Sequence, residues 1–409
     1  MGIVVIVRQQ SQTASVLKRA EDRGAAFVRT RTVSKLLNRF FGLTSKTEAL
    51  SFLLDVMIPS PTPDELRSLH GSIQLRSLIL TDGRVDEPLA ELLGTLPFLS
   101  SLSLNDYELS DTDLRKVLKS FKKLGGLRML QLRNTFLTDQ GLAELGECTS
   151  LHSIAIDGSK IEGSGLAALN LSGYFRLSLQ RANLSDTSLS AFASANPSPR
   201  LRELRLDGNP ITDAGLKSLY GLTALDHLGI GGTKITPNGL TELLKKQALT
   251  GLGLNDLPWT MADLQQLPHD SNKLVQLDLA GWSIGDEDLK SLPTLPKLGS
   301  LDLSRTRITD AGMRELARFP ALKWIQLDGT QVTIKGLNEL LKSLKLRTIS
   351  VGKTGITYED LLAMPPILSL ESIVLDGADL SVDQLRKLGL RHPNACIRSD
   401  DRFVLPQNQ

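Results

Sequence analysis

The sequence predicts an α/β solenoid of about 13 repeats of 24 residues, a horseshoe with a concave parallel sheet and short helices outside. Three observations support this fold class. Apolar residues recur at a fixed spacing along most of the chain, 81 of the 409 residues are Leu, and only 4% are aromatic. So much Leu beside so few large rings indicates many small, similar core layers rather than a few large cores.

The repeat opens with the spacing apolar-x-x-apolar-x-apolar. It starts at thirteen positions, separated by 23 to 28 residues and mostly by 24: Leu75, Leu99, Leu127, Leu151, Tyr174, Leu201, Leu225, Leu249, Leu274, Leu298, Leu322, Leu346 and Leu370. Two further apolar residues follow in register, such as Ile211 and Leu216 in the repeat from Leu201. The spacing therefore predicts that each repeat adds the same side chains to one continuous core.

Each repeat is predicted to form a short strand followed by a turn. Residues 201–206 alternate with period two at their end, as a half-buried strand does. An Asp-Gly pair is a turn signal; it occurs at Asp207-Gly208 and recurs at Asp157-Gly158, Asp328-Gly329 and Asp376-Gly377. Because one repeat cannot bury its apolar side alone, neighbouring strands should pair in parallel.

A short helix should complete each repeat. The twelfth position is Ser or Thr in ten repeats and Asp86 in the first, with Glu162 and Gly285 as the exceptions. Side-chain oxygens at this point accept hydrogen bonds from the unpaired N–H groups of a first helical turn. An Asp often follows, as Asp213 does, where the helix dipole favours negative charge.

The charge balance argues against several classes of protein. Lys and Arg number 47 against 45 Asp and Glu, a net charge of +2, which gives no sign of a nucleic-acid partner. Residues 1–50 carry nine basic and three acidic residues, or +6, so residues 51–409 carry −4. Cys148 and Cys396 cannot form a disulfide framework, and no Cys/His group has metal-ligand spacing. We therefore expect no metal, no cofactor and no enzymatic activity.

The chain is predicted to have four parts. Residues 1–50 form a basic flank, with helices expected at 16–23 and 36–41 around a strand-like segment at 26–28. Residues 51–74 are a degenerate capping repeat, 75–393 the solenoid, and 394–409 a C-terminal cap or tail. Flanks of this kind cover the open sheet edges of a solenoid.

The repeats of residues 201–222 and 298–319 resemble leucine-rich repeat proteins. Their segments Ile211-Thr-Asp-Ala-Gly-Leu216 and Ile308-Thr-Asp-Ala-Gly-Met313 match the subtype shared by ribonuclease inhibitors, F-box substrate receptors and planctomycete proteins. The ninth position departs from the family's Asn, which occurs here only as Asn209; Thr or Ser is the most frequent residue there instead. Tyr107, Leu257 and Trp282 at this position predict that its hydrogen-bond ladder is interrupted there.

The candidate binding residues lie on the concave face, at the third, fifth, seventh and eighth positions of the repeats. One predicted patch is mainly acidic and has a single ring: Gln276, Asp278, Asp302, Trp324, Gln326 and Asp328. A second set is basic: Arg133, Arg181 and Arg205. A Trp among carboxylates has the composition of an interface hot spot, although the Asp-Gly turn by itself also explains Asp328.

The sequence and the resemblance together favour a non-enzymatic, monomeric scaffold that binds a protein or peptide on its concave face. One alternative is a substrate receptor of a ubiquitin-ligase-type complex, which needs an adaptor-binding helix before the repeats. The other is an envelope-associated structural protein. A cytoplasmic location is favoured, because the apolar run at residues 2–7 is too short to span a membrane. If that run is the end of a longer anchor, membrane attachment is the alternative.

Overall fold

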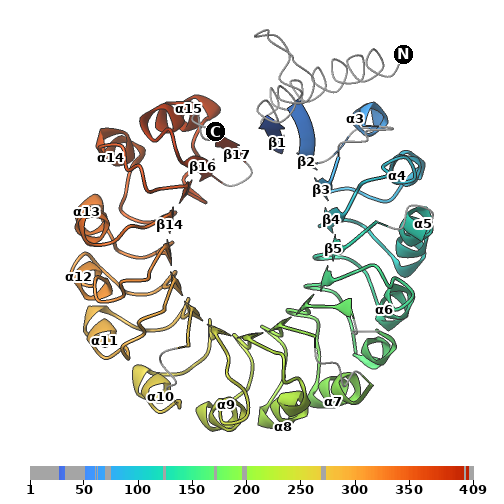
Figure 1. Ribbon diagram of the computed structural model, residues 1–409, viewed down its shortest axis with the longest axis horizontal. Coiled ribbons are helices and arrows are strands. Elements are labelled where there is room, and N and C mark those ends of the chain that lie inside the picture. The colour runs from blue at the N-terminus through green and yellow to red at the C-terminus, as the bar shows by residue number, and fades with distance from the viewer. Residues whose placement is uncertain are drawn as a thin grey trace, which may run out of the picture. The chain divides into compact units, whose positions relative to one another are not determined.

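The computed structural model describes residues 27–32, 51–59, 61, 63–69, 75–122, 126–169, 173–195, 200–268, 273–399 and 402–404. It divides the chain into two compact units, Met1–Ala182 and Asn183–Gln409. Within each unit the strands line the inner side of a stack of repeats and the helices lie outside (Figure 1). The predicted α/β solenoid is confirmed, and strands β3 to β15 correspond to the thirteen repeats read from the sequence.

The first unit contains β1 (Phe27–Thr32), β2 (Ser51–Pro59), α3 (Pro63–Ser68), β3 (Ser77–Thr81), α4 (Glu87–Leu93), β4 (Ser101–Asn105), α5 (Asp111–Lys122), β5 (Met129–Gln131), α6 (Asp139–Leu145), β6 (Ser153–Ala155), the 3-10 helix η1 (Ser164–Ala168) and β7 (Arg176–Ser178). The second unit begins with α7 (Asp186–Ala195), β8 (Glu203–Arg205), α8 (Asp213–Lys217), the 3-10 helix η3 (Ser218–Gly221), β9 (His227–Gly229), α9 (Pro237–Leu244), β10 (Gly251–Gly253) and α10 (Met261–Gln265). It continues with β11 (Gln276–Asp278), α11 (Asp286–Lys290), β12 (Ser300–Asp302), α12 (Met313–Leu316), β13 (Trp324–Gln326), α13 (Ile334–Ser343), β14 (Thr348–Ser350), α14 (Tyr358–Ala363), β15 (Ser372–Val374), α15 (Val382–Arg391), β16 (Cys396–Ser399) and β17 (Arg402–Val404).

Parallel pairing puts equivalent residues of successive repeats into rows. Strands β2 to β7 pair in order in the first unit, and β8 to β16 do so in the second. The fourth residue of each repeat points into the core, and this row is at most 7% exposed at Leu204, Leu228, Leu252, Leu277, Leu301, Ile325 and Ile349. The repeated Leu pattern therefore builds the core directly, one thin layer per repeat.

The turn after each strand has one residue in the left-handed region. All thirteen residues at the eighth position have φ between 51° and 79°: Asp82, Asp106, Asn134, Gly158, Arg181, Gly208, Gly232, Asp256, Gly281, Arg305, Gly329, Lys353 and Gly377. Gly, Asn and Asp tolerate this conformation best, which explains the Asp-Gly signal. The same turn forms in repeats that lack the Asp-Gly pair, so the geometry of the repeat requires it whichever residue is present.

Side chains cap the helices at the twelfth position, as predicted. Thr236, for example, accepts a hydrogen bond from the backbone N–H of Gly239. In the repeat from Leu151, where Glu162 replaces the Ser or Thr, the helix is the short 3-10 segment η1 and has no side-chain cap. The repeat from Leu274 also lacks a side-chain cap, at Gly285, but forms the α-helix α11, so a missing cap does not by itself decide the helix type.

The Asp that follows the cap has a second role beside the expected dipole effect. Asp213 accepts hydrogen bonds from the Thr236 backbone N–H at 2.8 Å and from the Thr236 hydroxyl at 2.7 Å, in the next repeat. Four other Asp residues bind the next Thr in the same way: Asp111, Asp186, Asp286 and Asp310. A Cβ on Gly239 would collide with the Asp213 carboxylate. The Thr-Asp-x-Gly signature is therefore a link between repeats.

The ninth position is largely as predicted, with one correction. Buried Thr233, Thr306 and Thr330 donate their hydroxyls to the carbonyl three residues earlier. Trp282 was predicted to interrupt this hydrogen bonding, but its indole N–H donates to the Leu254 carbonyl of the preceding repeat at 2.7 Å. The prediction was wrong because the indole is long enough to reach a carbonyl that a Thr could not.

Antiparallel strands cover the outer edges of both parallel sheets. In the first unit β1 pairs with β2, and in the second β17 pairs with β16. Covering an edge removes the row of unpaired backbone groups that would template aggregation. The two helices predicted at 16–23 and 36–41 lie outside the described residues, and the division into four parts stays a prediction.

Candidate functional site

The predicted acidic patch comes from three neighbouring strands of the second unit. Register places Gln276, Ser300 and Trp324 in one row, and Asp278, Asp302 and Gln326 in the next. We call Gln276, Asp278, Asp302, Trp324, Gln326 and Asp328 the acidic patch. The structure therefore brings these six predicted residues onto one face of β11–β13 and the turn after β13.

Exposure divides the acidic patch into a rim and a floor. Trp324, Gln276 and Gln326 are exposed, and Trp324 keeps 44% of its surface accessible. Asp278, Asp302 and Asp328 are half-buried. Most large apolar residues of the repeats are buried, so a Trp left open on the sheet face is a surface on which a ligand could bury apolar area.

Asp278 is the most perturbed carboxylate of the acidic patch. Its carboxylate accepts from the Ala280 N–H at 2.9 Å. Burial, together with the neighbouring negative charge of Asp302, nevertheless raises the pKa of Asp278 to about 7. Burial also raises the pKa of Asp302, against the opposing effect of its hydrogen bonds with Ser304. A cation placed beside these groups would favour their charged forms.

Arg305, which lies in the turn after β12 beside the acidic patch, is already paired. Arg305 binds both oxygens of Asp256 at 2.9 Å. This hydrogen bonding lowers the pKa of Asp256 below its ordinary value. The positive charge of Arg305 therefore mainly compensates the negative charge of Asp256. The carboxylates of Asp278 and Asp302 are not part of this ion pair.

Asp328 also links two repeats. Its Oδ1 accepts from the Gly352 N–H at 2.7 Å, just as Asp207 Oδ1 accepts from the Gly231 N–H at 2.9 Å. The Asp-Gly turn signal therefore explains only part of the role of these residues. Their second role could have been read from the sequence only by comparing the seventh position across repeats.

The glycine-rich strands β9 and β10 have few side chains of their own on the sheet face. In the structure, side chains of the preceding repeat lie over them, because a Cβ on Gly229 would meet Asp207 and a Cβ on Gly251 would meet His227. His227 is itself bound to Asp226 at 2.6 Å. The surface of β9 and β10 is therefore covered by polar side chains of the preceding repeats.

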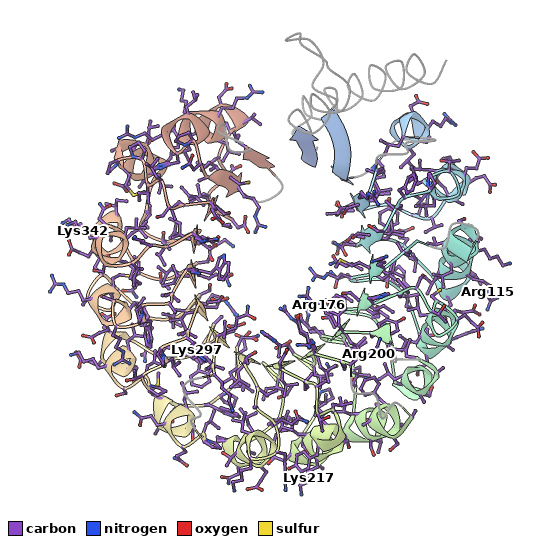
Figure 2. All side chains as sticks on the ribbon, in the orientation of Figure 1. Arg115, Arg176, Arg200, Lys217, Lys297 and Lys342 are labelled. Carbon is purple, nitrogen blue, oxygen red and sulfur yellow. The ribbon has the colours of Figure 1, made fainter. Side chains whose placement is uncertain are left out.

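The predicted basic residues do not form one cluster. In the first unit Arg133 pairs with the buried carboxylate of Asp157 at 3.1 Å, and Arg181 is exposed on a left-handed turn. Arg205 belongs to the second unit and pairs with Glu203 at 2.8 Å. Figure 2 shows Arg176 projecting from the strand side of the first unit, opposite Arg115 on the helix side. Two of the three predicted arginines thus have intramolecular partners.

Sequence reasoning missed Asp256 and its pairing with Arg305. The two residues occupy the eighth position of repeats two apart, so a row-by-row comparison of that position would have placed them on the same side. Within the described part of the chain, no group of three His, Cys, Asp or Glu side chains is arranged to hold a metal ion. Neither cysteine forms a disulfide. Among the described residues, no helix has both the length and the apolar character needed to cross a bilayer.

Comparisons with known proteins agree with the repeat and the fold. The family model described as "Leucine Rich repeat" matches residues 198–219 and 294–317. No curated protein sequence matches the chain. A solved structure of the yeast Rad7 and Elc1 complex is similar over 89% of this chain and 92% of that one, with 19% identity and a TM-score of 0.50.

Two other solved structures are more distant. An internalin from Listeria monocytogenes has 18% identity and a TM-score of 0.34, covering 78% of this chain and 94% of that one. The mouse RP105/MD-1 complex has 17% identity and a TM-score of 0.39, covering 73% and 53%. The thirteen repeats and the parallel strand rows therefore form a solenoid with the leucine-rich repeat fold, and the family model matches two stretches of it.

Proposed function

We propose that this protein is a non-enzymatic scaffold that binds a protein or peptide ligand through the acidic patch on β11–β13. The observation that carries the proposal is Trp324, exposed beside the half-buried carboxylates of Asp278 and Asp302. Aromatic anchors flanked by polar groups are typical of binding hot spots. The repeat fold supports the proposal, because a solenoid presents an extended and rigid surface.

The chemistry of the acidic patch also favours one class of ligand. An extended segment that carries Lys or Arg next to an apolar side chain fits best. The cation would contact Asp278 and Asp302, and the apolar group would contact the Trp324 ring. Because the strands hold these residues in place, little conformational entropy is lost on binding. The similar yeast structure is a complex of Rad7 with Elc1, which is compatible with a role in protein assembly.

The alternatives predicted from the sequence stay predictions. A substrate receptor needs an adaptor-binding helix ahead of the repeats, and the predicted helices of that flank lie outside the described residues. The envelope-associated alternative depends on the same flank. No feature of the described residues favours either over the concave-face scaffold.

The test is affinity capture with the immobilised protein, followed by mass spectrometry of the captured proteins. The variant Trp324→Ala/Asp302→Ala should lose the specific partner while remaining folded, with a thermal unfolding midpoint no lower than that of wild type. The control is Leu368→Ala/Asp383→Ala, which removes an apolar residue more exposed than Trp324, at 72% against 44%, and an exposed carboxylate elsewhere in the same unit. If the patch variant captures the same partner as wild type with unchanged affinity, the assignment of the site is wrong.

A further inference from the structure

Positive charge gathers along one edge of the second unit, where the chain returns from each helix and enters the next strand. Backbone hydrogen bonds of 2.7 to 2.9 Å join the second residues of successive repeats into a row there: Val275, Gly299, Lys323, Arg347 and Glu371. Lys297 and Lys345 lie on the same edge, because each directly precedes the first Leu of a repeat. We call Lys297, Lys323, Lys345 and Arg347 the basic edge, and all four side chains are exposed.

Most of the charge of the basic edge is uncompensated. Arg347 pairs with Glu371 at 3.1 Å. The three lysines form no ion pair and no side-chain hydrogen bond within the described part of the chain. Nearby Arg318 is different, because it donates to the carbonyls of Leu289 and Lys290 at the end of α11. Cations at a helix end often have such a capping role, but the lysines of the basic edge do not, so their charge is available to a partner.

Two open leucines continue the basic edge toward the C-terminus. Leu368, in the segment between α14 and β15, is 72% exposed, and Leu390, in the last turn of α15, is 65% exposed. They are the two most exposed large apolar side chains that the structure describes in the second unit. Arg391, next to Leu390, donates to the Met364 carbonyl after α14 at 2.7 Å, so the two leucines come from adjoining segments. Leucines beside cations have the composition of a surface that meets both water and lipid.

The opposite edge of the same repeats, where the helices begin, is acidic. The first turns of α11, α14 and α15 carry six carboxylates: Asp286, Glu287, Asp288, Glu359, Asp360 and Asp383. The helix dipole favours negative charge at these positions. The second unit therefore has two edges of unlike charge. A negatively charged surface attracts the basic edge and repels the acidic one, which fixes the orientation of the unit on such a surface.

We propose that the basic edge docks on the surface of an anionic lipid bilayer, with Leu368 and Leu390 entering the boundary between head groups and acyl chains. A bilayer of this kind supplies negative charge to the lysines and an apolar environment to the leucines. A soluble acidic peptide meets the first requirement and leaves the leucines in water. The docking residues differ from those of the acidic patch, so the two proposals can be tested separately.

The test is sedimentation of the full chain with vesicles of phosphatidylcholine alone and with vesicles of equal parts phosphatidylcholine and phosphatidylglycerol. Wild type should bind only the anionic vesicles, and less at high salt, because salt screens the attraction. A lysine near such a surface strengthens binding about fivefold. Removing three in Lys297→Gln/Lys323→Gln/Lys345→Gln should therefore weaken vesicle binding roughly a hundredfold.

The matched control is Lys217→Gln/Lys234→Gln/Lys335→Gln, which makes the same change in net charge at exposed lysines away from the basic edge. Lys217, for example, projects from the helix side (Figure 2). This control should bind as tightly as wild type. Both variants keep the basic residues of segment 1–50, so any contribution of that segment to vesicle binding is the same in the two. Thermal unfolding checks that both are folded.

The leucines are tested by Leu368→Ala/Leu390→Ala, which should weaken binding to the anionic vesicles roughly tenfold and leave binding to soluble polyglutamate unchanged. Failure of wild type to bind the anionic vesicles would overturn the proposal. So would equal binding by the basic-edge variant and its control. If wild type binds polyglutamate but not the vesicles, the partner of the basic edge is an acidic protein segment and the assignment to a membrane is wrong.

Discussion

Replacing Asp278 with Asn should stabilise the folded protein at neutral pH and leave its stability nearly unchanged near pH 4. The pKa of Asp278 is raised from the ordinary 3.8 to about 7, first by burial and then by the charge of Asp302. The folded state therefore binds the Asp278 proton more tightly than the unfolded state does. Stability must then fall as the pH rises from 4 to 7, where the folded protein loses the proton.

The size of the effect follows from this shift. A shift of about three pKa units at about 1.4 kcal/mol per unit gives an upper limit of roughly 4 kcal/mol at pH 7 and above. At pH 5 the destabilisation reaches only about a third of this limit, because the pH is then only about one unit above the pKa of Asp278 in the unfolded chain. Asn keeps the acceptor for the Ala280 N–H and carries no charge. Asp278→Asn should thus gain stability with increasing pH up to about 7.

The assay is urea unfolding between pH 4 and pH 8, followed by tryptophan fluorescence. The three Trp residues of the chain lie within two repeats of Asp278: Trp282 in the same repeat, Trp259 in the preceding one and Trp324 two repeats further on. They therefore report the local unfolding that matters in a repeat protein, where cooperativity across the whole chain is not assured. The control is Asp383→Asn, an exposed carboxylate on α15. A pH-independent difference between wild type and Asp278→Asn, or a loss of stability in the variant at pH 8, would refute the reasoning.

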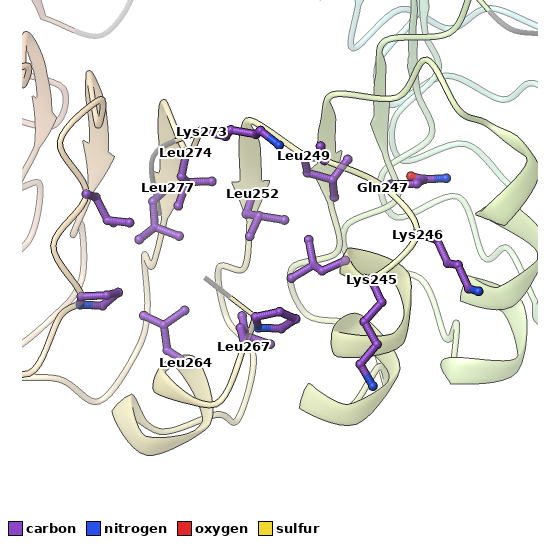
Figure 3. A pocket seen from close by; sticks show the side chains of 15 residues that line it. Lys245, Lys246, Gln247, Leu249, Leu252, Leu264, Leu267, Lys273, Leu274 and Leu277 are labelled. Carbon is purple, nitrogen blue, oxygen red and sulfur yellow. The ribbon is translucent and has the colours of Figure 1, made fainter. Parts of the chain in front are cut away.

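Three further outcomes are expected. Gly239→Ala should destabilise the protein by about 1–3 kcal/mol, and less so in an Asp213→Ala background, because its Cβ collides with the Asp213 carboxylate; a double-mutant cycle by urea unfolding measures the difference. Leu252→Ala should lower the free energy of unfolding by an amount at the low end of the roughly 2–5 kcal/mol range for such truncations, because Leu252 already borders a cavity (Figure 3). Leu228→Ala should cost more, and equal losses of stability in the two variants by thermal unfolding would contradict this. Affinity for a cationic ligand at the acidic patch should rise from pH 6 to pH 8 as Asp278 ionises, and titration calorimetry should show no such rise in Asp278→Asn.

The fold was predictable because most repeats carry two signals. The spacing of the leucines marks the core positions, and the Ser or Thr marks the start of the helix. Parallel pairing then follows from burial alone. The acidic patch was predictable for the same reason: in a stack with fixed register, residues 24 positions apart become neighbours. Gln276 and Trp324 were therefore placed on one face without knowledge of any contact.

The state of those residues was not predictable from spacing. The raised pKa of Asp278 depends on how deeply its carboxylate is buried and on its closeness to Asp302. The pairing of Arg305 with Asp256 joins repeats two apart. The indole of Trp282 donates to the Leu254 carbonyl, a partner that repeat spacing alone does not identify. Each of these depends on side-chain reach and solvent access, and both are properties of the assembled stack.

The sequence by itself thus determined the repeat, the parallel pairing of the repeat strands and the face on which polar residues lie, because these follow from local periodicity and burial. Only the tertiary structure decided which charges are compensated, and that the Asp after the cap links several repeats to the next. Those outcomes depend on distances between residues of different repeats, and such distances exist only after the repeats have stacked.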